Sequence, residues 1–187
     1  MKKSTMILLG VLAVIVIIIS MLGGSYNALV TKQEQVDKEL ANIDVQLERR
    51  ADLIPNLVST VKGYTSHESE IIDKITSARE NLLKADSVSE KNTANNELTS
   101  ALNALMVVVE NYPDLKSNQN FIQLSDELAG TENRIATARR DYNNSVTSYN
   151  TSIKKFPTNI LAGMFGFEKK DYFEVSEGKT NVPNVEF

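Results

Sequence analysis

Apolar residues recur at alternating steps of four and three along residues 26–64, just after an uninterrupted apolar run. They form two ladders with a period of seven. The first ladder is Val36, Ile43, Arg50, Leu57 and Tyr64, and the second is Leu40, Leu47, Ile54 and Val61. This spacing, sustained over about four heptads, predicts a long amphipathic helix that packs in a bundle or coiled coil.

Two residues of this predicted helix depart from the pattern. Arg50 occupies a ladder position where a core residue is expected. Pro55 removes the backbone hydrogen bond to the carbonyl of Ala51 and crowds that turn, so we expect a kink there. Because the ladders keep their phase across Pro55, the pattern predicts one bent helix and not two.

Three further helices are predicted downstream. The stretches 65–68 (TSHE) and 87–90 (SVSE) match the capping box, which predicts a helix start at each. Pro113 is expected to end the third helix, Asn118 to cap the fourth, and Pro157 to close it. The predicted buried stripes are Ile71, Ile75, Ala78, Leu82 and Ala85, then Leu98, Leu102, Leu105, Val109 and Tyr112, then Phe121, Leu128, Ile135, Tyr142, Tyr149 and Phe156. Short links between these helices favour antiparallel neighbours.

The apolar run before the first ladder has the length of a membrane span. Residues 6–22 are 17 residues without a charge, preceded by two lysines, and three flanking residues extend the run to 20. About 20 residues suffice to cross a hydrocarbon core of about 30 Å. A cleaved signal peptide is the competing interpretation, but its apolar core would be only about 7–15 residues long. We therefore expect an uncleaved anchor over residues 1–24.

The basic residues that flank the anchor bear on its orientation. Lys2 and Lys3 precede the apolar run, and Lys32 and Lys38 follow it. All four lie within about 20 residues of its ends, the window that counts for the positive-inside rule. With the amino terminus included, the count leans toward an N-terminus inside and a helical domain outside.

The end of the chain, residues 158–187, loses the helical period but is rich in aromatic residues. It holds five of the chain's 12 Phe and Tyr, namely Phe165, Phe167, Tyr172, Phe173 and Phe187. A solvated tail is not expected to expose so many of them. Docking onto the bundle is one interpretation, and a partner-binding or membrane-surface segment is the other.

Composition narrows the possible functions. Charged residues make up 24% of the chain and hydrophobic residues 42%, which is typical of a folded protein. Beyond residue 25 there are 18 basic and 24 acidic residues, a net charge of −6, which does not favour nucleic-acid binding. The chain has no cysteine, which excludes disulfides, thiolate metal sites and cysteine nucleophiles.

The residue types needed for metal or nucleophilic chemistry are also missing from the pattern. A di-metal site in a helical bundle needs two Glu-x-x-His pairs, but the single histidine, His67, has no glutamate three residues before it. With one histidine and no cysteine, no assembled base and nucleophile can be identified. We therefore expect no catalytic residue, no metal and no cofactor.

A polar constellation on the two long helices remains as the candidate site. Its members are Arg49, Arg50, Asp52, Asn56, Glu132, Arg134, Arg139, Arg140 and Asn143. Steps of four and three place Glu132, Arg139 and Asn143 on one face of the fourth helix, in line with Asn150. One interpretation is an interhelical network in which Arg50 pairs with a carboxylate such as Glu132, because an unpaired buried arginine is very costly. The other is a site for a phosphate or carboxylate, which arginine forks bind well.

Several of these residues also carry a family resemblance. The sequence resembles the bacterial LemA family over nearly its whole length. The matching stretches, in the same order, are residues 26–30, 44–64, 111–121, 131–157 and 165–167. The resemblance implies a membrane-anchored helical bundle with no established activity, and it brings no catalytic residue with it. It also implies a short N-terminus outside and a cytoplasmic domain, opposite to the charge count.

These observations together predict an all-α, single-pass membrane protein. We expect an anchor over residues 1–24, a LemA-like antiparallel up-and-down four-helix bundle over 25–157 and an aromatic docking tail over 158–187. The first function hypothesis is a non-enzymatic scaffold or adaptor that binds a protein partner at the membrane. The alternative is a binding module for an anionic small molecule or lipid headgroup, held by Arg50, Arg139 and Arg140.

Overall fold

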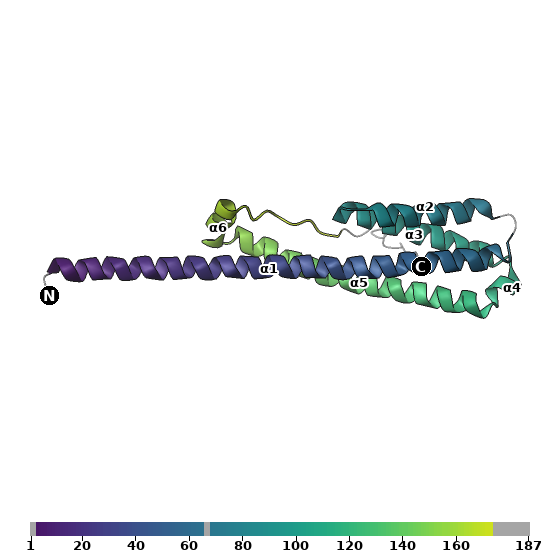
Figure 1. Cartoon of the computed structure of the whole chain (residues 1–187), viewed down its shortest axis with the longest axis horizontal. Helices are drawn as coiled ribbons and strands as arrows, with labels where there is room; N and C mark the ends of the chain where they lie inside the picture. Colours follow the sequence, from purple (N-terminus) through teal and green to yellow (C-terminus); the bar gives the residue numbers. More distant parts are fainter. Residues whose placement is uncertain (1–2, 66–67, 174–187) are drawn as a thin grey trace, which may run out of the picture. The chain divides into compact units, whose positions relative to one another are not determined.

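The computed structural model describes residues 3–65 and 68–173, and within them every regular element is a helix. These helices are α1 (Lys3–Lys62), α2 (Ser69–Lys84), α3 (Val88–Val109), α4 (Pro113–Lys116), α5 (Gln119–Lys154) and α6 (Thr158–Phe165). The prediction of an all-α chain is therefore confirmed. Figure 1 shows α2 and α3 side by side, and these two helices pack closely against each other.

Helix α1 joins the apolar N-terminal run and the heptad ladders in one uninterrupted element of 60 residues. Within the described residues it is the one helix that is long and apolar enough to cross a membrane. Side chains of its apolar run, such as Ile7 and Val14, are exposed, with relative exposures of 68% and 56%. This surface needs an apolar environment outside the chain.

The described residues divide into two compact units. The first comprises residues 3–39 and 142–171, and the second comprises residues 40–65, 68–141 and 172–173. Helices α1 and α5 each contribute one part to each unit. We describe each unit by itself.

The core of the second unit follows most of the predicted stripes, but Leu40, Ala85, Leu102 and Tyr112 are only half-buried. Its buried apolar residues are Ile43, Leu47, Ala51, Ile54, Leu57 and Val61 of α1; Ile72, Ile75, Ala78 and Leu82 of α2; Ala94, Leu98, Leu105 and Val109 of α3; Leu115 of α4; Phe121, Leu128, Ile135 and Ala138 of α5; and Phe173. The ladder prediction fails at Tyr64, which lies beyond the last residue of α1 and is 43% exposed. In α2 the stripe begins at Ile72, and Ile71 is only half-buried.

The two predicted capping boxes have different outcomes. At the start of α3 the Ser87 side chain accepts from the backbone N–H of Glu90, and the Glu90 carboxylate accepts from that of Ser87. The box predicted over residues 65–68 is wrong, because α2 begins only at Ser69 and has no side-chain cap. The Thr65 hydroxyl instead donates to the carbonyl of Val61 at 3.1 Å and so caps the last turn of α1.

Proline and asparagine mark the remaining helix ends. Helix α3 already ends at Val109, and Pro113 starts α4, where its missing N–H costs nothing. Asn118 caps α5 as predicted, because its Oδ1 accepts from the N–H of Phe121 at 3.1 Å. Helix α5 ends at Lys154, so Phe156 leaves the predicted buried stripe and is 80% exposed.

The first unit is built from the N-terminal part of α1, the C-terminal part of α5, and α6. Its buried apolar residues are Leu29, Val36, Tyr142, Val146, Tyr149, Leu161 and Ala162. Gly166 ends α6 in the left-handed region, with φ of 71°, and lets the chain turn back. The Tyr26 ring then packs edge-to-face against Phe165 and Phe167, with centroids 4.9 and 5.7 Å apart. Residues 165–170 thus contact α1 and α5 within this unit, while Phe187 lies outside the described residues.

Candidate functional site

The centre of the candidate site is Arg50, a buried arginine on α1 in the second unit. Its Nη1 donates to Glu132 Oε2 at 2.5 Å, to Asn95 Oδ1 at 2.6 Å and to Thr99 Oγ1 at 3.1 Å. The Arg50 side chain is only 4% exposed, whereas that of Glu132 is 39% exposed. The predicted pairing of Arg50 with Glu132 is therefore present, and the pair reaches solvent only on its carboxylate side.

Regular helical spacing brings these partners to Arg50. Asn95 and Thr99 are one turn apart on α3, and the Thr99 hydroxyl also lies 2.9 Å from the Asn95 carbonyl. Glu132 comes from α5. Two helices, α3 and α5, thus supply the acceptors for one guanidinium group of α1, which ties the three helices together at this level.

Burial dominates the electrostatics of this network. It lowers the pKa of Arg50 from its ordinary value, while the Glu132 carboxylate opposes this change and the positive charge of Arg139 adds to it. Burial also lowers the pKa of Arg139, again opposed by Glu132. Because an arginine starts from so high a value, both side chains stay charged at neutral pH. A single carboxylate therefore faces two cations.

Among the other predicted site residues, Arg139 acts on this network through its charge. Arg139 is half-buried and its Cζ lies 5.4 Å above the ring of Phe173, a cation–π arrangement within the second unit. Arg140 is exposed and pairs with Asp141 at 3.3 Å. Four further residues of the predicted site lie in the second unit and are exposed, namely Arg49, Asp52, Asn56 and Arg134. Asn143 is half-buried and belongs to the first unit.

Sequence reasoning missed the α3 contribution to the network. Asn95 is fully buried, and it continues the stripe of Leu98, Leu102 and Leu105 backward by a step of three. The available signal was that Asn95 is a polar residue at a position of the buried stripe, as Arg50 is on α1. Thr99 has no such signal, because it lies beside the stripe.

A second arginine compensates for the proline inside α1. Pro55 leaves the carbonyl of Ala51 without its helical donor, and Ala51 is fully buried. The Nε of Arg79, on α2, donates to this carbonyl at 2.8 Å. The buried acceptor is therefore satisfied from a neighbouring helix, which fixes α2 against α1 at this turn.

A cavity of about 370 Å³ lies next to the arginine network, within the second unit. Its lining includes Arg50, Leu57, Thr99, Leu105, Leu128 and Glu132. The wall is mostly apolar, and its charged end is the Arg50–Glu132 pair itself. A small ligand with an apolar body has the size that this space accepts.

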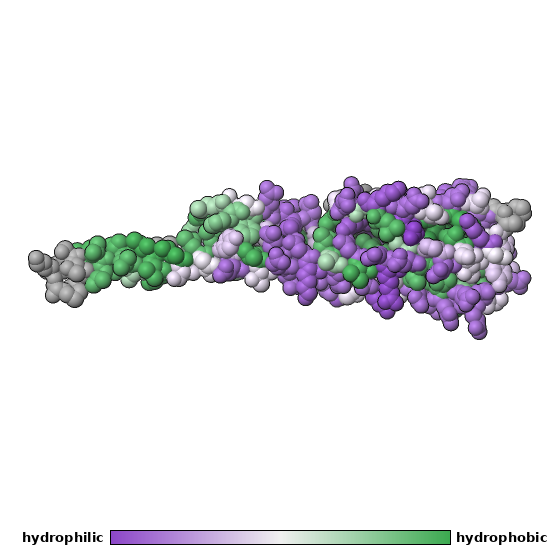
Figure 2. Space-filling view, in the orientation of Figure 1, coloured by the Kyte–Doolittle hydropathy of each residue, from purple (hydrophilic) through white to green (hydrophobic). Residues whose placement is uncertain are grey.

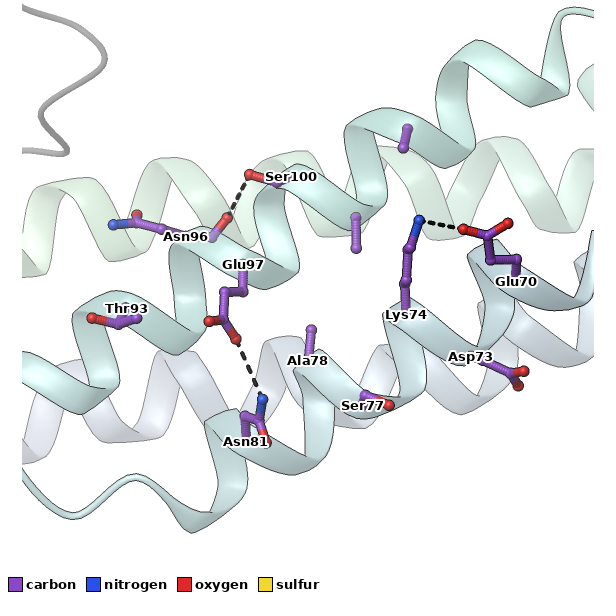
Figure 3. A pocket seen from close by; sticks show the side chains of 12 residues that line it. Glu70, Asp73, Lys74, Ser77, Ala78, Asn81, Thr93, Asn96, Glu97 and Ser100 are labelled. Carbon is purple, nitrogen blue, oxygen red and sulfur yellow. Dashed lines mark hydrogen bonds and ion pairs between the residues drawn. The ribbon is translucent and has the colours of Figure 1, made fainter.

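A larger and more open groove of about 810 Å³ runs between α2 and α3 (Figure 3). Small side chains form much of its lining, namely Ser77, Ala78, Ser100, Ala101 and Ala104. Two polar contacts lie at the edges of this groove. Lys74 pairs with Glu70 at 2.7 Å, and Asn81 of α2 donates to Glu97 of α3 at 3.3 Å. Small residues allow another backbone to approach closely, so the groove suits an extended or helical segment.

Metal chemistry has no support in the part of the chain that is described. Within residues 3–65 and 68–173, no group of three or more His, Asp or Glu side chains is placed to hold a metal ion. His67 lies outside the described residues.

In the first unit, polar side chains hold the segment after α6. Asn150, which is buried, donates from Nδ2 to the carbonyl of Lys170 at 2.8 Å and accepts its N–H at 3.0 Å. The Tyr142 hydroxyl donates to the carbonyl of Asp171 at 2.9 Å, and Lys170 pairs with Asp37 at 3.1 Å. The Asn150 side chain thus satisfies both backbone polar groups of Lys170, as a neighbouring β-strand would, although the segment after α6 has no regular structure.

The buried phenol of Tyr142 predicts a loss of stability in alkali. Burial raises its pKa to about 12, helped by the Asp171 and Asp37 carboxylates. Because the folded pKa exceeds the unfolded value of about 10, this stabilisation is complete below about pH 10 and disappears as the pH rises to about 12. We expect the urea midpoint of the full chain in detergent to fall between about pH 9 and pH 11.5, and to fall less for Tyr142→Phe. An equal fall in both proteins would contradict the assignment.

Comparison with known proteins gives a consistent set of relatives. The sequence model of the LemA family matches residues 39–187. Magnetosome protein MamQ 1 of Paramagnetospirillum magneticum is 31% identical over an alignment that covers 90% of this chain and 71% of the relative. Magnetosome protein MamQ of Magnetospirillum gryphiswaldense is 30% identical, covering 95% and 75%. Protein LemA of Metamycoplasma hominis is 29% identical, covering 82% and 71%.

Proposed function

Because this chain belongs to the LemA family, we propose that it is a non-enzymatic scaffold of the cell membrane that binds a protein partner. The N-terminal part of α1 supplies the single-pass anchor, and its exposed apolar side chains support this role. Continuity of α1 from the apolar run into the second unit supports direct attachment of the helical domain to the anchor.

We further propose that the second unit is an up-and-down four-helix bundle with antiparallel neighbours. The contacts of Arg50 with α3 and α5, and of Arg79 with α1, support a common core of four helices. The anchor then covers residues 1–24, the helical domain residues 25–157, and the tail residues 158–187.

The observation that carries the scaffold proposal is the open groove between α2 and α3. It is accessible along the surface of the second unit, and small side chains form much of its lining. Charged and amide side chains at the edges of the groove, such as Lys74 and Glu97, can form hydrogen bonds that fix the position of a partner segment along it. A partner segment of about two helical turns or more matches such a groove, with charge at the rim giving specificity.

Site-directed photocrosslinking tests this proposal in intact cells. Benzoylphenylalanine at Ala104, an exposed position in the groove, should give a discrete adduct with one partner. The control is Val107, which is 71% exposed on the same helix and does not line the groove. A Ser77→Arg change on the opposite wall should abolish the adduct. No adduct, or the same adduct from both positions, would contradict a partner in the groove.

A second candidate, binding of an anionic ligand, rests on the cavity beside Arg50. The cavity ends at a buried guanidinium group, which suits phosphate or carboxylate. Against it, the Nη1 of Arg50 already binds Glu132, whose negative charge repels an anion. If the candidate holds, phosphate raises the thermal midpoint of the chain but not that of Arg50→Met. An equal response of both proteins excludes this site.

A further inference from the structure

Helix α6 exposes an apolar face although it belongs to a packed unit. The relative exposures of Ile160, Met164 and Phe165 are 53%, 72% and 58%. Its opposite face is buried through Leu161 and Ala162. No residue of Thr158–Phe165 is charged, and Figure 2 shows hydrophobic atoms gathered over this helix. An eight-residue helix with this composition is not adapted to face water.

The position of α6 within its unit relates this face to the apolar run of α1. Phe165 packs on Tyr26, with ring centroids 4.9 Å apart. Tyr26 lies one helical turn after Leu22, where the apolar run ends. A tyrosine at the end of a span typically lies at the level of the lipid headgroups. Through this contact, α6 is held beside the end of the apolar run of α1.

Charge around α6 also suits a lipid surface. Lys154 and Lys155 precede the helix and Lys169 follows it, all exposed, against the single acid Glu168 in the same stretch. Phe156, which is 80% exposed, lies between the lysines and the helix. Apolar side chains next to basic ones are the composition of segments that lie in the membrane interface.

We propose that α6, together with Phe156, is a second membrane contact that lies in the headgroup region beside the span of α1. The occupant of its exposed face is bilayer lipid. The inference rests on the proposed anchor but goes beyond it, because it assigns a membrane-binding role to a segment about 140 residues downstream of the span. Buried Leu161 and Ala162 orient the helix so that Ile160 and Met164 point away from its own unit.

Fluorescence quenching by brominated lipids tests this contact directly. The chain has no tryptophan, so a single introduced one reports alone. We would reconstitute full-length Met164→Trp, Val107→Trp and Val14→Trp in vesicles of phosphatidylcholine and phosphatidylglycerol, with and without bromine on the upper acyl chains. A side chain about 5–10 Å into the interface lies near these bromines, so the emission of Met164→Trp should fall at least about twofold. Val107→Trp, in the second unit, should be unaffected.

The Val14→Trp protein separates this inference from the anchor itself. Quenching of Val14→Trp without quenching of Met164→Trp would overturn the α6 contact and leave the anchor in place. Failure of both would overturn the anchor. A blue-shifted but unquenched Met164→Trp emission would mean that protein, such as a second copy of the chain, covers α6, and this also overturns the inference. As a further check, Met164→Glu should reduce the quenching of a tryptophan placed at Ile160.

Discussion

Glu132→Leu should destabilise the second unit by about 3 to 5 kcal/mol, because it leaves the charge of Arg50 buried without a counter-ion. Arg50→Met should cost less, about 1 to 3 kcal/mol, because the main loss is the donor to the buried amide of Asn95. The asymmetry follows from exposure: Glu132 is 39% exposed and can be hydrated when its partner is removed, whereas Arg50 is 4% exposed and cannot.

The double variant makes this prediction sharper. In the Arg50→Met background, Glu132→Leu should have little further effect, since no buried charge remains to be unpaired. Urea unfolding of the full chain in detergent, followed by far-UV circular dichroism, gives all four free energies of unfolding. Glu127→Leu, at an exposed carboxylate on the same helix, is the matched control. Additive effects of the two changes would show that the pair does not act as a unit.

Asn150→Leu should release the segment that follows α6. The change keeps the branching and the number of side-chain heavy atoms but removes both hydrogen bonds to the backbone of Lys170, at a cost of about 2 kcal/mol. Because Gly166 and Lys170 bracket a segment without regular structure, the loss should appear locally before the helices unfold.

Trypsin provides the measurement for this second prediction. Cleavage after Lys169 or Lys170 should become faster in Asn150→Leu, and the amide of Lys170 should exchange faster with solvent. Asn144→Leu, an exposed asparagine on the same helix, should leave both rates unchanged. Equal cleavage rates in the two variants would mean that Asn150 does not hold the segment.

The features that the sequence predicted well are those with a period. The ladders of α1 placed Ile43, Leu47, Ile54 and Leu57 in the core, because a helix that buries one stripe must repeat it every seven residues. The same repeat singled out Arg50, and the high cost of an unpaired buried arginine made a carboxylate such as Glu132 the expected partner.

Features without a period could not be found in this way. The stretch 65–68 has the letters of a capping box, but the motif cannot reveal that Thr65 caps the end of the preceding helix instead. The pairing of Asn150 with Lys170 depends on how the chain turns back after Gly166, and nothing in the local sequence encodes that return. Most of the arginines in the predicted site proved to be surface residues, because a basic residue next to a ladder position is normally solvated.

The hydrogen bond from Arg79 to the Ala51 carbonyl determines the order in which Pro55 and Arg79 can be substituted during evolution. While Pro55 is present, loss of Arg79 leaves a buried acceptor without a donor. Once Pro55 has been replaced by a residue with an N–H, the helix supplies its own bond and position 79 is free to change. A lineage can therefore lose the proline first and the arginine later at little cost, whereas the reverse order passes through a destabilised protein. Substitutions at positions 55 and 79, which are 24 residues apart, are therefore coupled in evolution.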